Sequence, residues 1–231
     1  MKVTYLEHSG FAAEYKEYVL IFDWYRGSLP EFDQQKKIYV FASHSHYDHF
    51  NKKIFGWSEQ YPDVRYILSA DIAGKEQSEE QSERTVYVTA NKKYDFDGIK
   101  VQTLHSTDEG VAFIVYMEDK VIYHAGDLNW WHWEEEDDAY NRMMRGDYQK
   151  EIETLTGEKI DLAFVVLDPR QEEQFYWGFD WYMRHTDTKI VFPMHMWKQY
   201  EVQDRLIGME VSEPYREKIM RIREMGQVFE L

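Results

Sequence analysis

The chain has 231 residues, of which 43% are hydrophobic and 17% aromatic, and it carries a formal net charge of −16. This composition supports one globular domain, or two tightly fused halves, and excludes a disordered chain. A surface this acidic repels phosphate backbones, so we expect no nucleic-acid partner.

The sequence contains no cysteine, which excludes disulfides and thiolate metal ligands and fits a cytoplasmic location. No apolar run approaches the roughly 20 residues that a membrane-spanning helix needs, so we expect no membrane partner. A strand-like pattern over residues 2–6 leaves no room for a signal peptide.

Short apolar runs alternate along the chain with stretches of helical spacing. The runs predict strands over residues 2–6, 18–22, 38–41, 101–104, 111–117, 121–123, 162–167 and 190–193. Residues 118–120 predict a hairpin turn between two of these strands. Helices are predicted over residues 50–57, 70–81, 131–155 with interruptions, and 213–225. This mixture of elements predicts an α+β fold.

Most of the predicted strands lead into a polar residue that can bind a ligand or move a proton. These residues are Asp23, His44, His105, Asp127, Asp168 and His195. Strands that deliver such side chains at their C-terminal ends are typical of a sheet with a functional site along one rim.

The segment 44–49 places three imidazoles and one carboxylate within six residues, directly after the predicted strand 38–41. Imidazole and carboxylate are the ligand types that hold catalytic zinc and related divalent ions. His44 and His46 are two residues apart in extended chain, so both can turn toward one ion. A helix start at Asp48 and His49 would direct these two toward a neighbouring ion. The sequence therefore predicts a metal site.

The His-x-His-x-Asp-His pattern after a strand resembles the signature of the metallo-β-lactamase superfamily of metal-dependent hydrolases. The resemblance extends from His8 to His195. It implies a single hydrolase domain over residues 1–231 with a four-layer αββα sandwich. It also implies two divalent ions per chain, with zinc as the first expectation and manganese or iron as alternatives for a ligand set without sulfur.

The family pattern, carried over residue by residue, assigns seven metal ligands. One metal takes His44, His46 and His105, the second takes Asp48, His49 and His195, and Asp127 bridges the two. Asp23 stands where the family has a carboxylate behind the ligands.

The same resemblance implies the chemistry. A metal-bridged hydroxide attacks a carbonyl or phosphoryl centre. Asp127 can accept the proton of the water, and Asp48 can pass a proton to the leaving group, so these two are the catalytic candidates.

Within the superfamily, the chain resembles the L-ascorbate-6-phosphate lactonase-like branch. The shared features are His8-Ser9-Gly10-Phe11, the strand end that leads to Asp127, and the segment 192–195. They imply hydrolysis of a small-molecule ester, lactone or phosphoester, with the oligomeric state open.

A phosphodiesterase or nuclease is disfavoured by the net charge. A metal-dependent oxidoreductase is disfavoured by His46, where di-iron relatives usually carry a carboxylate. A binding protein without catalysis is disfavoured because both catalytic candidates are present.

Further residues near the predicted ligands leave two interpretations open. His8 and His124 either support the site or are ordinary packed histidines. Arg170 either binds a substrate anion or pairs with Asp168. The aromatic stretch 130–133, including Trp130, either lines the pocket or anchors a helix.

Overall fold

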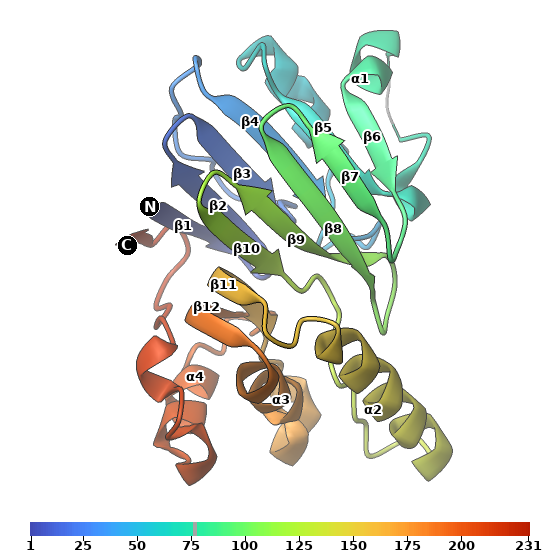
Figure 1. The fold of residues 1–231 in the computed structure, drawn as a ribbon, viewed down its shortest axis with the longest axis vertical. Helices are drawn as coiled ribbons and strands as arrows, with labels where there is room; N and C mark the ends of the chain where they lie inside the picture. Colours follow the sequence, from blue (N-terminus) through green and yellow to red (C-terminus); the bar gives the residue numbers. More distant parts are fainter. Residues whose placement is uncertain (76–77) are drawn as a thin grey trace. The chain divides into compact units, whose positions relative to one another are not determined.

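Two mixed β-sheets organise the chain, and each belongs to one of two units (Figure 1). The computed structural model describes residues 1–75 and 78–231. The first unit comprises residues 1–89 and 223–231, and the second comprises residues 90–222.

The first unit is built on a seven-stranded sheet with the order β13-β1-β2-β3-β4-β5-β6. Its strands are β1 (Lys2–Glu7), β2 (Gly10–Tyr15), β3 (Tyr18–Phe22), β4 (Lys37–Ala42), β5 (Arg65–Ser69), β6 (Thr85–Val88) and β13 (Val228–Glu230). The pairs from β13 to β3 are antiparallel, and those from β3 to β6 are parallel. The C-terminal ends of β3, β4 and β5 therefore meet at one edge of the sheet.

The parallel strands of this unit are continuous apolar runs because side chains on both of their faces are buried. Every residue of β3 is buried, and so are Ile38 to Ala42 of β4. Short helices connect the strands: η1 (Lys52–Glu59), η2 (Ala70–Ile72) and α1 (Glu79–Glu83). Ile54 and Phe55 of η1 pack into the same core as β3 and β4, which fixes the chain that follows β4.

The second unit is built on a six-stranded sheet with the order β12-β11-β10-β9-β8-β7. Its strands are β7 (Lys93–Phe96), β8 (Ile99–His105), β9 (Val111–Met117), β10 (Lys120–His124), β11 (Lys159–Val166) and β12 (Asp187–Met194). Strands β7 to β10 form an antiparallel meander, whereas β10, β11 and β12 are parallel. The parallel strands again bring their C-terminal ends to one edge.

The helices of the second unit follow its parallel strands. They are α2 (Asp138–Glu153), η3 (Pro169–Gln174), α3 (Trp177–His185), α4 (Glu201–Gly208), η4 (Glu210–Ser212) and η5 (Arg216–Lys218). None of the helices in the described part of the chain is both long and apolar enough to cross a membrane. Two mixed sheets with helices confirm the α+β class predicted from the sequence.

The predicted strands are all present, with boundaries within about three residues of the prediction. The hairpin turn is also present, with Glu118 in the left-handed region at φ 55°. Among the helices, 131–155 corresponds to α2 and 50–57 to η1, which begins only at Lys52 after the Asn51 cap. The predicted helix start at Asp48 and His49 is therefore wrong, because these residues form a turn.

Of the other two predicted helices, one is interrupted between η2 and α1 and the other does not form. The prediction over 70–81 includes residues 76–77, which lie outside the described residues. In the described part, the helix ends where Ala73 has a non-helical ψ of 139° and Gly74 has φ 82°. The prediction over 213–225 fails because Ile219 bridges Val191 in parallel, and Met220 donates its N–H to the Val191 carbonyl at 2.9 Å. Pairing with the edge of β12 competes with helix formation there. Helices α3 and α4 were not predicted.

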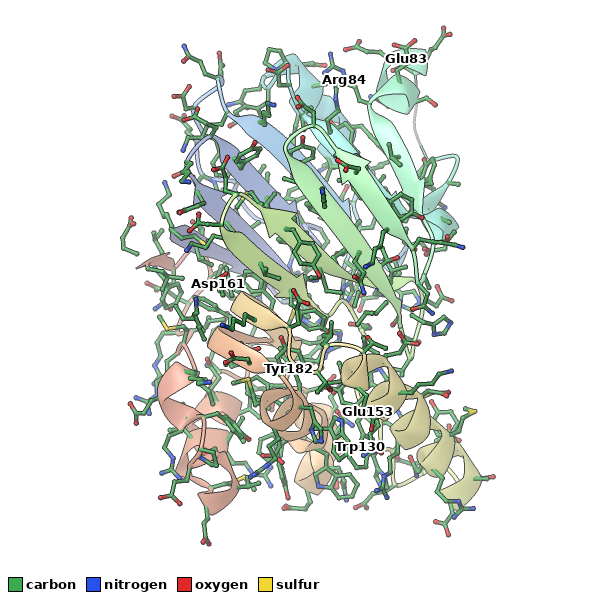
Figure 2. All side chains as sticks on the ribbon, viewed as in Figure 1. Glu83, Arg84, Trp130, Glu153, Asp161 and Tyr182 are labelled. Atoms are coloured by element: carbon green, nitrogen blue, oxygen red, sulfur yellow. The ribbon has the colours of Figure 1, made fainter. Side chains whose placement is uncertain are left out.

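Asp161 of β11 ties three parallel strands together (Figure 2). Its carboxylate accepts the Val121 N–H of β10 at 3.0 Å and the Lys189 ammonium of β12 at 2.6 Å. Burial by itself raises the pKa of Asp161, but the hydrogen bonds from Lys189 and Val121 and the nearby lysine charges outweigh it, and the pKa is lowered.

We expect Asp161→Asn to lower the free energy of unfolding by about 1 kcal/mol at neutral pH, because a charge-assisted hydrogen bond is lost. Since the pKa of the folded carboxyl lies below that of an unfolded Asp, about 3.9, its stabilisation is present above that value and is lost as the pH falls further. Urea unfolding at pH 7 and at pH 3 measures both effects. A difference between the proteins that did not change with pH would contradict the ionic role.

Candidate metal centre

In the first unit, the candidate ligands His44, His46, Asp48 and His49 lie in the tight loop that follows β4. The loop turns where the N–H groups of His49 and Phe50 both donate to the carbonyl of His46, at 3.1 and 3.0 Å. Asp71, which follows β5, accepts the Ser45 N–H at 2.7 Å and holds the loop from outside. The rings of His44 and His46 are adjacent, with Nε2 of the first 3.0 Å from Nδ1 of the second.

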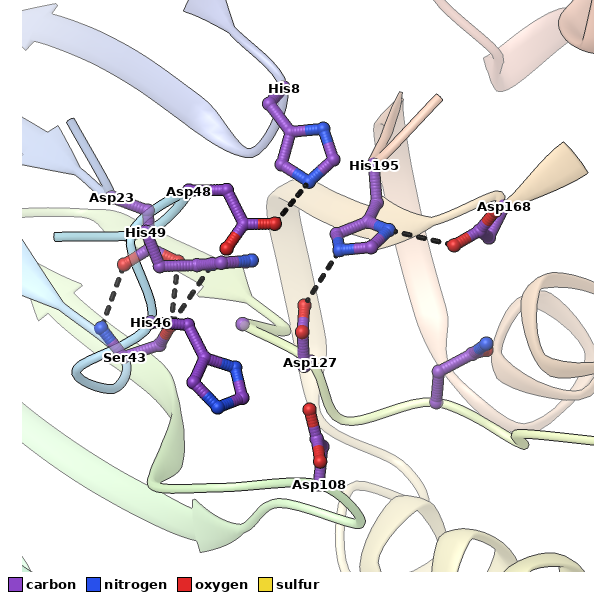
Figure 3. A network of polar contacts seen from close by, with 12 residues as sticks. His8, Asp23, Ser43, His46, Asp48, His49, Asp108, Asp127, Asp168 and His195 are labelled. Carbon is purple, nitrogen blue, oxygen red and sulfur yellow. Dashed lines mark hydrogen bonds and ion pairs between the residues drawn. The ribbon is translucent and has the colours of Figure 1, made fainter. Parts of the chain in front are cut away.

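Three residues of this unit form a second group of ligand atoms. His8, Asp48 and His49 each offer one atom, and these atoms lie within 4.8 Å of one another. His8 Nε2 is 3.5 Å from Asp48 Oδ2 (Figure 3), and the His8 and His49 rings meet edge to face with centroids 5.6 Å apart. His8 is therefore a neighbour of two predicted ligands.

Asp23 organises the loop from beneath. Its fully buried carboxylate accepts the Ser43 N–H at 2.7 Å, the Ser43 hydroxyl at 2.6 Å and Nδ1 of His49 at 2.7 Å (Figure 3). Because a carboxylate only accepts, Nδ1 of His49 carries the hydrogen and Nε2 keeps its lone pair. The Ser43 hydroxyl donates its hydrogen to Asp23 and therefore accepts one from Nδ1 of His44 at 2.9 Å. Nε2 of His44 consequently also keeps its lone pair.

The electrostatics keep Asp48 ionised. Burial by itself raises the pKa of Asp48, but the hydrogen bond with His8 and the electrostatic effect of the neighbouring His49 and His8 imidazoles outweigh it and lower the pKa to about 2. A carboxyl group with this pKa is an anion at every pH at which the protein is expected to work, as a metal ligand must be.

The backbone is strained where it presents these residues. His8 and Asp23 have positive φ values of 54° and 44°, which cost free energy in residues with a Cβ. A Cβ at Gly10 would lie 2.9 Å from the Glu7 carbonyl oxygen and 3.2 Å from that of Asp23. The strand ends are thus packed too closely for any larger residue at position 10, and the strained residues coincide with the candidate site.

In the second unit, His195 follows β12 and lies between two carboxylates. Its Nδ1 donates to Asp168 at 2.9 Å, and its Nε2 is 3.4 Å from Asp127 Oδ1 (Figure 3). His195 also has a positive φ, of 63°. The carboxylate of Asp168 does for His195 what Asp23 does for His49: it fixes the hydrogen on Nδ1 and leaves Nε2 to bind a metal. The family pattern does not predict this role for Asp168, although its position after a strand is a visible signal in the sequence.

Of the two interpretations of Arg170, the structure shows the pairing with Asp168. The Arg170 guanidinium donates through Nε and Nη2 to the Asp168 carboxylate, with distances of 2.5 to 3.0 Å. It also stacks over Trp197, 4.6 Å from the ring centroid. Burial by itself raises the pKa of Asp168, but the hydrogen bonds from His195 and Arg170 outweigh it and the pKa is lowered.

Trp131, rather than Trp130, contacts the candidate ligands of this unit. The Trp131 indole N–H donates to the Asp127 carbonyl at 2.9 Å, and its ring lies 5.7 Å from that of His195. Trp130 packs instead against Trp177, with centroids 5.3 Å apart, and under the Arg145 guanidinium. Trp130 therefore anchors α2 and α3, as the packing interpretation of this stretch expects.

His124 and His105 are placed differently. His124 is fully buried, and its Nδ1 accepts the Gly126 N–H at 3.1 Å, which stabilises the turn that leads to Asp127.

His105 is exposed at the end of β8, where its backbone N–H donates to Glu151 of α2 at 3.1 Å. Among the described residues, His105 joins no group of possible metal ligands, whereas Asp108 has a carboxylate oxygen within 4.8 Å of one from Asp127. The sequence motif does not predict Asp108 as a ligand.

The donor atoms of both units fit a divalent metal. They are imidazole nitrogens and carboxylate oxygens, and in His49 and His195 the nitrogen opposite the carboxylate partner is the one a metal requires.

Residues 2–143 match the model of the beta-lactamase superfamily domain, and the chain belongs to this family. The match covers most of the first unit and the part of the second that contains Asp127. None of the curated proteins compared with the chain matches it.

Solved structures show that the chain has the metallo-β-lactamase fold. Igni18, a metallo hydrolase from the archaeon Ignicoccus hospitalis, is similar over 100% of this chain and 98% of its own, with a TM-score of 0.67 and 16% identity. YhfI from Bacillus subtilis, named a metallo-beta-lactamase fold protein, is similar over 99% and 98%, with a TM-score of 0.62 and 13% identity. The family agrees with the class of enzyme predicted from the sequence, a metal-dependent hydrolase, and these neighbours show its fold.

A third similar structure has a different chemistry. CmlA, a diiron beta-hydroxylase from Streptomyces venezuelae, is similar over 100% of this chain but only 54% of its own, with a TM-score of 0.64 and 11% identity. The fold therefore occurs with both hydrolytic and oxidative activities, and the residues of the site must distinguish them.

The role of Asp168 can be tested with a matched pair of variants. We expect Asp168→Asn to lower metal affinity about 10- to 100-fold, because the carboxylate that orients His195 is lost. Asp161→Asn, the same change in β11 of the same unit, should leave the affinity unchanged. Calorimetric titration of metal-free protein with Zn²⁺ measures both. Equal affinities in the two variants would contradict the assigned role.

Proposed function

We propose that the chain is a hydrolase of a small-molecule ester, lactone or phosphoester that uses two divalent metal ions and forms a single domain, residues 1–231. The observation that carries this proposal is the repeated pairing of a candidate ligand with a buried carboxylate: His49 with Asp23, and His195 with Asp168. An ordinary packed histidine needs no such partner on a fixed nitrogen, whereas a metal ligand almost always has one.

The proposed ligands are those of the family pattern. They are His44, His46, Asp48, His49, His105, Asp127 and His195. When bound, two ions supply a water that loses a proton near neutral pH and a Lewis acid that polarises the substrate oxygen. Zinc is the first candidate, with manganese and iron as alternatives, since the ligands are nitrogens and oxygens.

The chain's own residues complete the proposed chemistry. Asp127 holds a carboxylate oxygen 3.4 Å from Nε2 of His195 and can accept a proton there. Asp48, kept ionised beside His8, can carry a proton toward the leaving group after accepting one. Trp131 contacts both Asp127 and His195 and gives that side of the centre an apolar wall, which favours a compact substrate.

The charge of the molecule supports a small substrate. A net charge of −16 opposes a polyanion at long range, whereas a single anionic group can be held by the metals themselves. Arg170 is committed to Asp168, so its contribution to anion binding would be secondary. The lactonase-like branch, a cytoplasmic location and the absence of nucleic-acid and membrane partners are parts of this same proposal.

A metal-dependent oxidoreductase is the second candidate, because a diiron hydroxylase has a similar fold. The imidazole of His46, where di-iron relatives usually carry a carboxylate, favours the hydrolase.

Metal content is the first test. Protein purified without chelator should contain two divalent ions per chain by elemental analysis, because seven candidate ligands stand at the family positions. Dialysis against a chelator should remove the metal and the activity together, and added metal should restore both. No metal in the protein and no uptake on titration would refute the proposal.

Two substitutions test the assigned residues. Asp127→Asn and His46→Ala should each reduce hydrolysis by at least about 100-fold without unfolding the protein, because each removes a direct ligand. Circular dichroism checks the fold, and steady-state rates check the activity. Trp130→Phe is the control, since Trp130 packs against Trp177 and should leave the rate nearly unchanged. Full activity of either ligand variant would contradict its role.

The substrate class requires a direct screen. Metal-loaded protein should hydrolyse at least one member of a panel of lactones, aryl esters and linear or cyclic phosphodiesters, and it should leave structured RNA intact at physiological salt. Turnover of RNA with every small ester intact would favour the nuclease. Metal uptake with oxygen consumption and no hydrolysis would favour the oxidoreductase.

A further inference from the structure

The end of β8 offers two residues that could bind a metal, and the structure separates them. They are His105, the last residue of the strand, and Asp108, in the loop that joins β8 to β9. The family pattern selects His105, so the proposed ligand set depends on which of the two lies beside the other ligands of its own unit.

The loop places Asp108 next to Asp127. Thr107 is the link: its hydroxyl donates to the Asn129 carbonyl at 2.6 Å and accepts the Asn129 N–H at 3.0 Å. This pair of hydrogen bonds joins the β8–β9 loop to the segment that follows β10. Thr107 is the residue before Asp108, and Asn129 is two residues after Asp127. A carboxylate oxygen of Asp108 consequently lies within 4.8 Å of one from Asp127.

Both sides of this link are rigid. On one side, Ser106 donates its N–H to the Gly110 carbonyl at 3.4 Å, and its hydroxyl accepts the Asp108 N–H at 3.2 Å. On the other side, the Asn129 amide donates to the Gln171 side chain at 2.8 Å. A Cβ at Gly178 would collide with the Asn129 side-chain oxygen, so α3 also fixes this segment. The approach of Asp108 to Asp127 is therefore built into the fold of the unit.

His105 is held elsewhere. It pairs with Val111 in the antiparallel ladder between β8 and β9, and its N–H is engaged by Glu151 of α2. Its side chain is exposed and belongs to no group of possible metal ligands within the part of the chain that the structure describes. Its backbone is therefore fixed by a strand pairing and by a hydrogen bond to a helix.

We infer that Asp108, and not His105, is the ligand that the end of β8 contributes to the metal centre. The inference rests on the proposed function and changes its ligand set: Asp108 replaces His105, so one metal position has a carboxylate where the family pattern has an imidazole. Two imidazoles and one carboxylate form a harder donor set than three imidazoles, and such a set is well suited to Fe²⁺ or Mn²⁺. The preference of this metal position for zinc is therefore reduced.

Four variants test the inference: Asp108→Ala, Asp108→Asn, His105→Ala and Asp108→His. After metal loading and dialysis, elemental analysis should find two ions in the native chain and in His105→Ala, but close to one in Asp108→Ala and Asp108→Asn. In competition between equal Zn²⁺ and Mn²⁺, Asp108→His should raise the bound ratio of zinc to manganese at least tenfold over the native chain. The electron paramagnetic resonance signal of bound Mn²⁺ gives an independent reading.

Circular dichroism of each variant separates loss of a ligand from loss of the fold, and Asp108→Asn retains the shape of the side chain if the alanine variant unfolds. Loss of an ion in His105→Ala with two ions retained in Asp108→Asn would overturn the inference, and so would two ions in every variant. In both cases the native chain would still bind metal and hydrolyse its substrate, so the proposed function would survive. A native chain that takes up no metal would refute the proposed function, and the inference with it.

Discussion

The buried carboxylate of Asp23 is the interaction on which the first unit's half of the centre depends. With no exposed surface, it has no water to solvate its charge, and it needs donors from the protein. Ser43 and His49 supply these donors, and the Ser43 hydroxyl in turn accepts a hydrogen bond from Nδ1 of His44. A single requirement for charge compensation therefore fixes the ring orientation of two candidate ligands. The second unit repeats the device, with Asp168 and His195.

Backbone strain also occurs at the candidate site. His8, Asp23 and His195 all have φ values in the left-handed region, where a residue with a Cβ is disfavoured by roughly 1 to 3 kcal/mol. Such conformations persist only where the surrounding packing enforces them. Asp23 follows the fully buried strand β3, and His195 follows the buried C-terminal half of β12. His8 lies in the tight turn between the antiparallel strands β1 and β2. The free energy of folding thus opposes relaxation of the site.

The acidity of the chain and the chemistry of its centre are compatible. Anionic ligands gathered at strand ends repel one another until a cation compensates them. Asp48 is stabilised as an anion by its histidine neighbours, and Asp168 by His195 and Arg170. The carboxylates are therefore present in the form that metals bind, and the fold is prepared for an ion before one arrives.

The sequence by itself determined the strands and the main motif. Continuous apolar runs identify buried strands because both faces of a parallel strand are covered, and six residues that contain three imidazoles and a carboxylate, 44–49, are specific enough to indicate a metal site. It also located Asp23 and Asp127, since each follows such a strand. Short helices were less predictable: α3 and α4 were missed, and the 213–225 prediction failed because Ile219 pairs with a strand. The helix propensity of a segment contains no information on whether a distant strand will pair with it.

Only the tertiary structure decided between neighbouring candidates. His105 and Asp108 are three residues apart, and no sequence pattern shows which one lies beside Asp127, because the answer depends on the hydrogen bonds of Thr107 with Asn129. The same holds for Trp130 and Trp131, and for Arg170, whose partner Asp168 also orients His195. Spacing along a chain fixes which residues are available. Which of them meet is fixed by contacts between segments far apart in the sequence, and those contacts exist only in the folded protein.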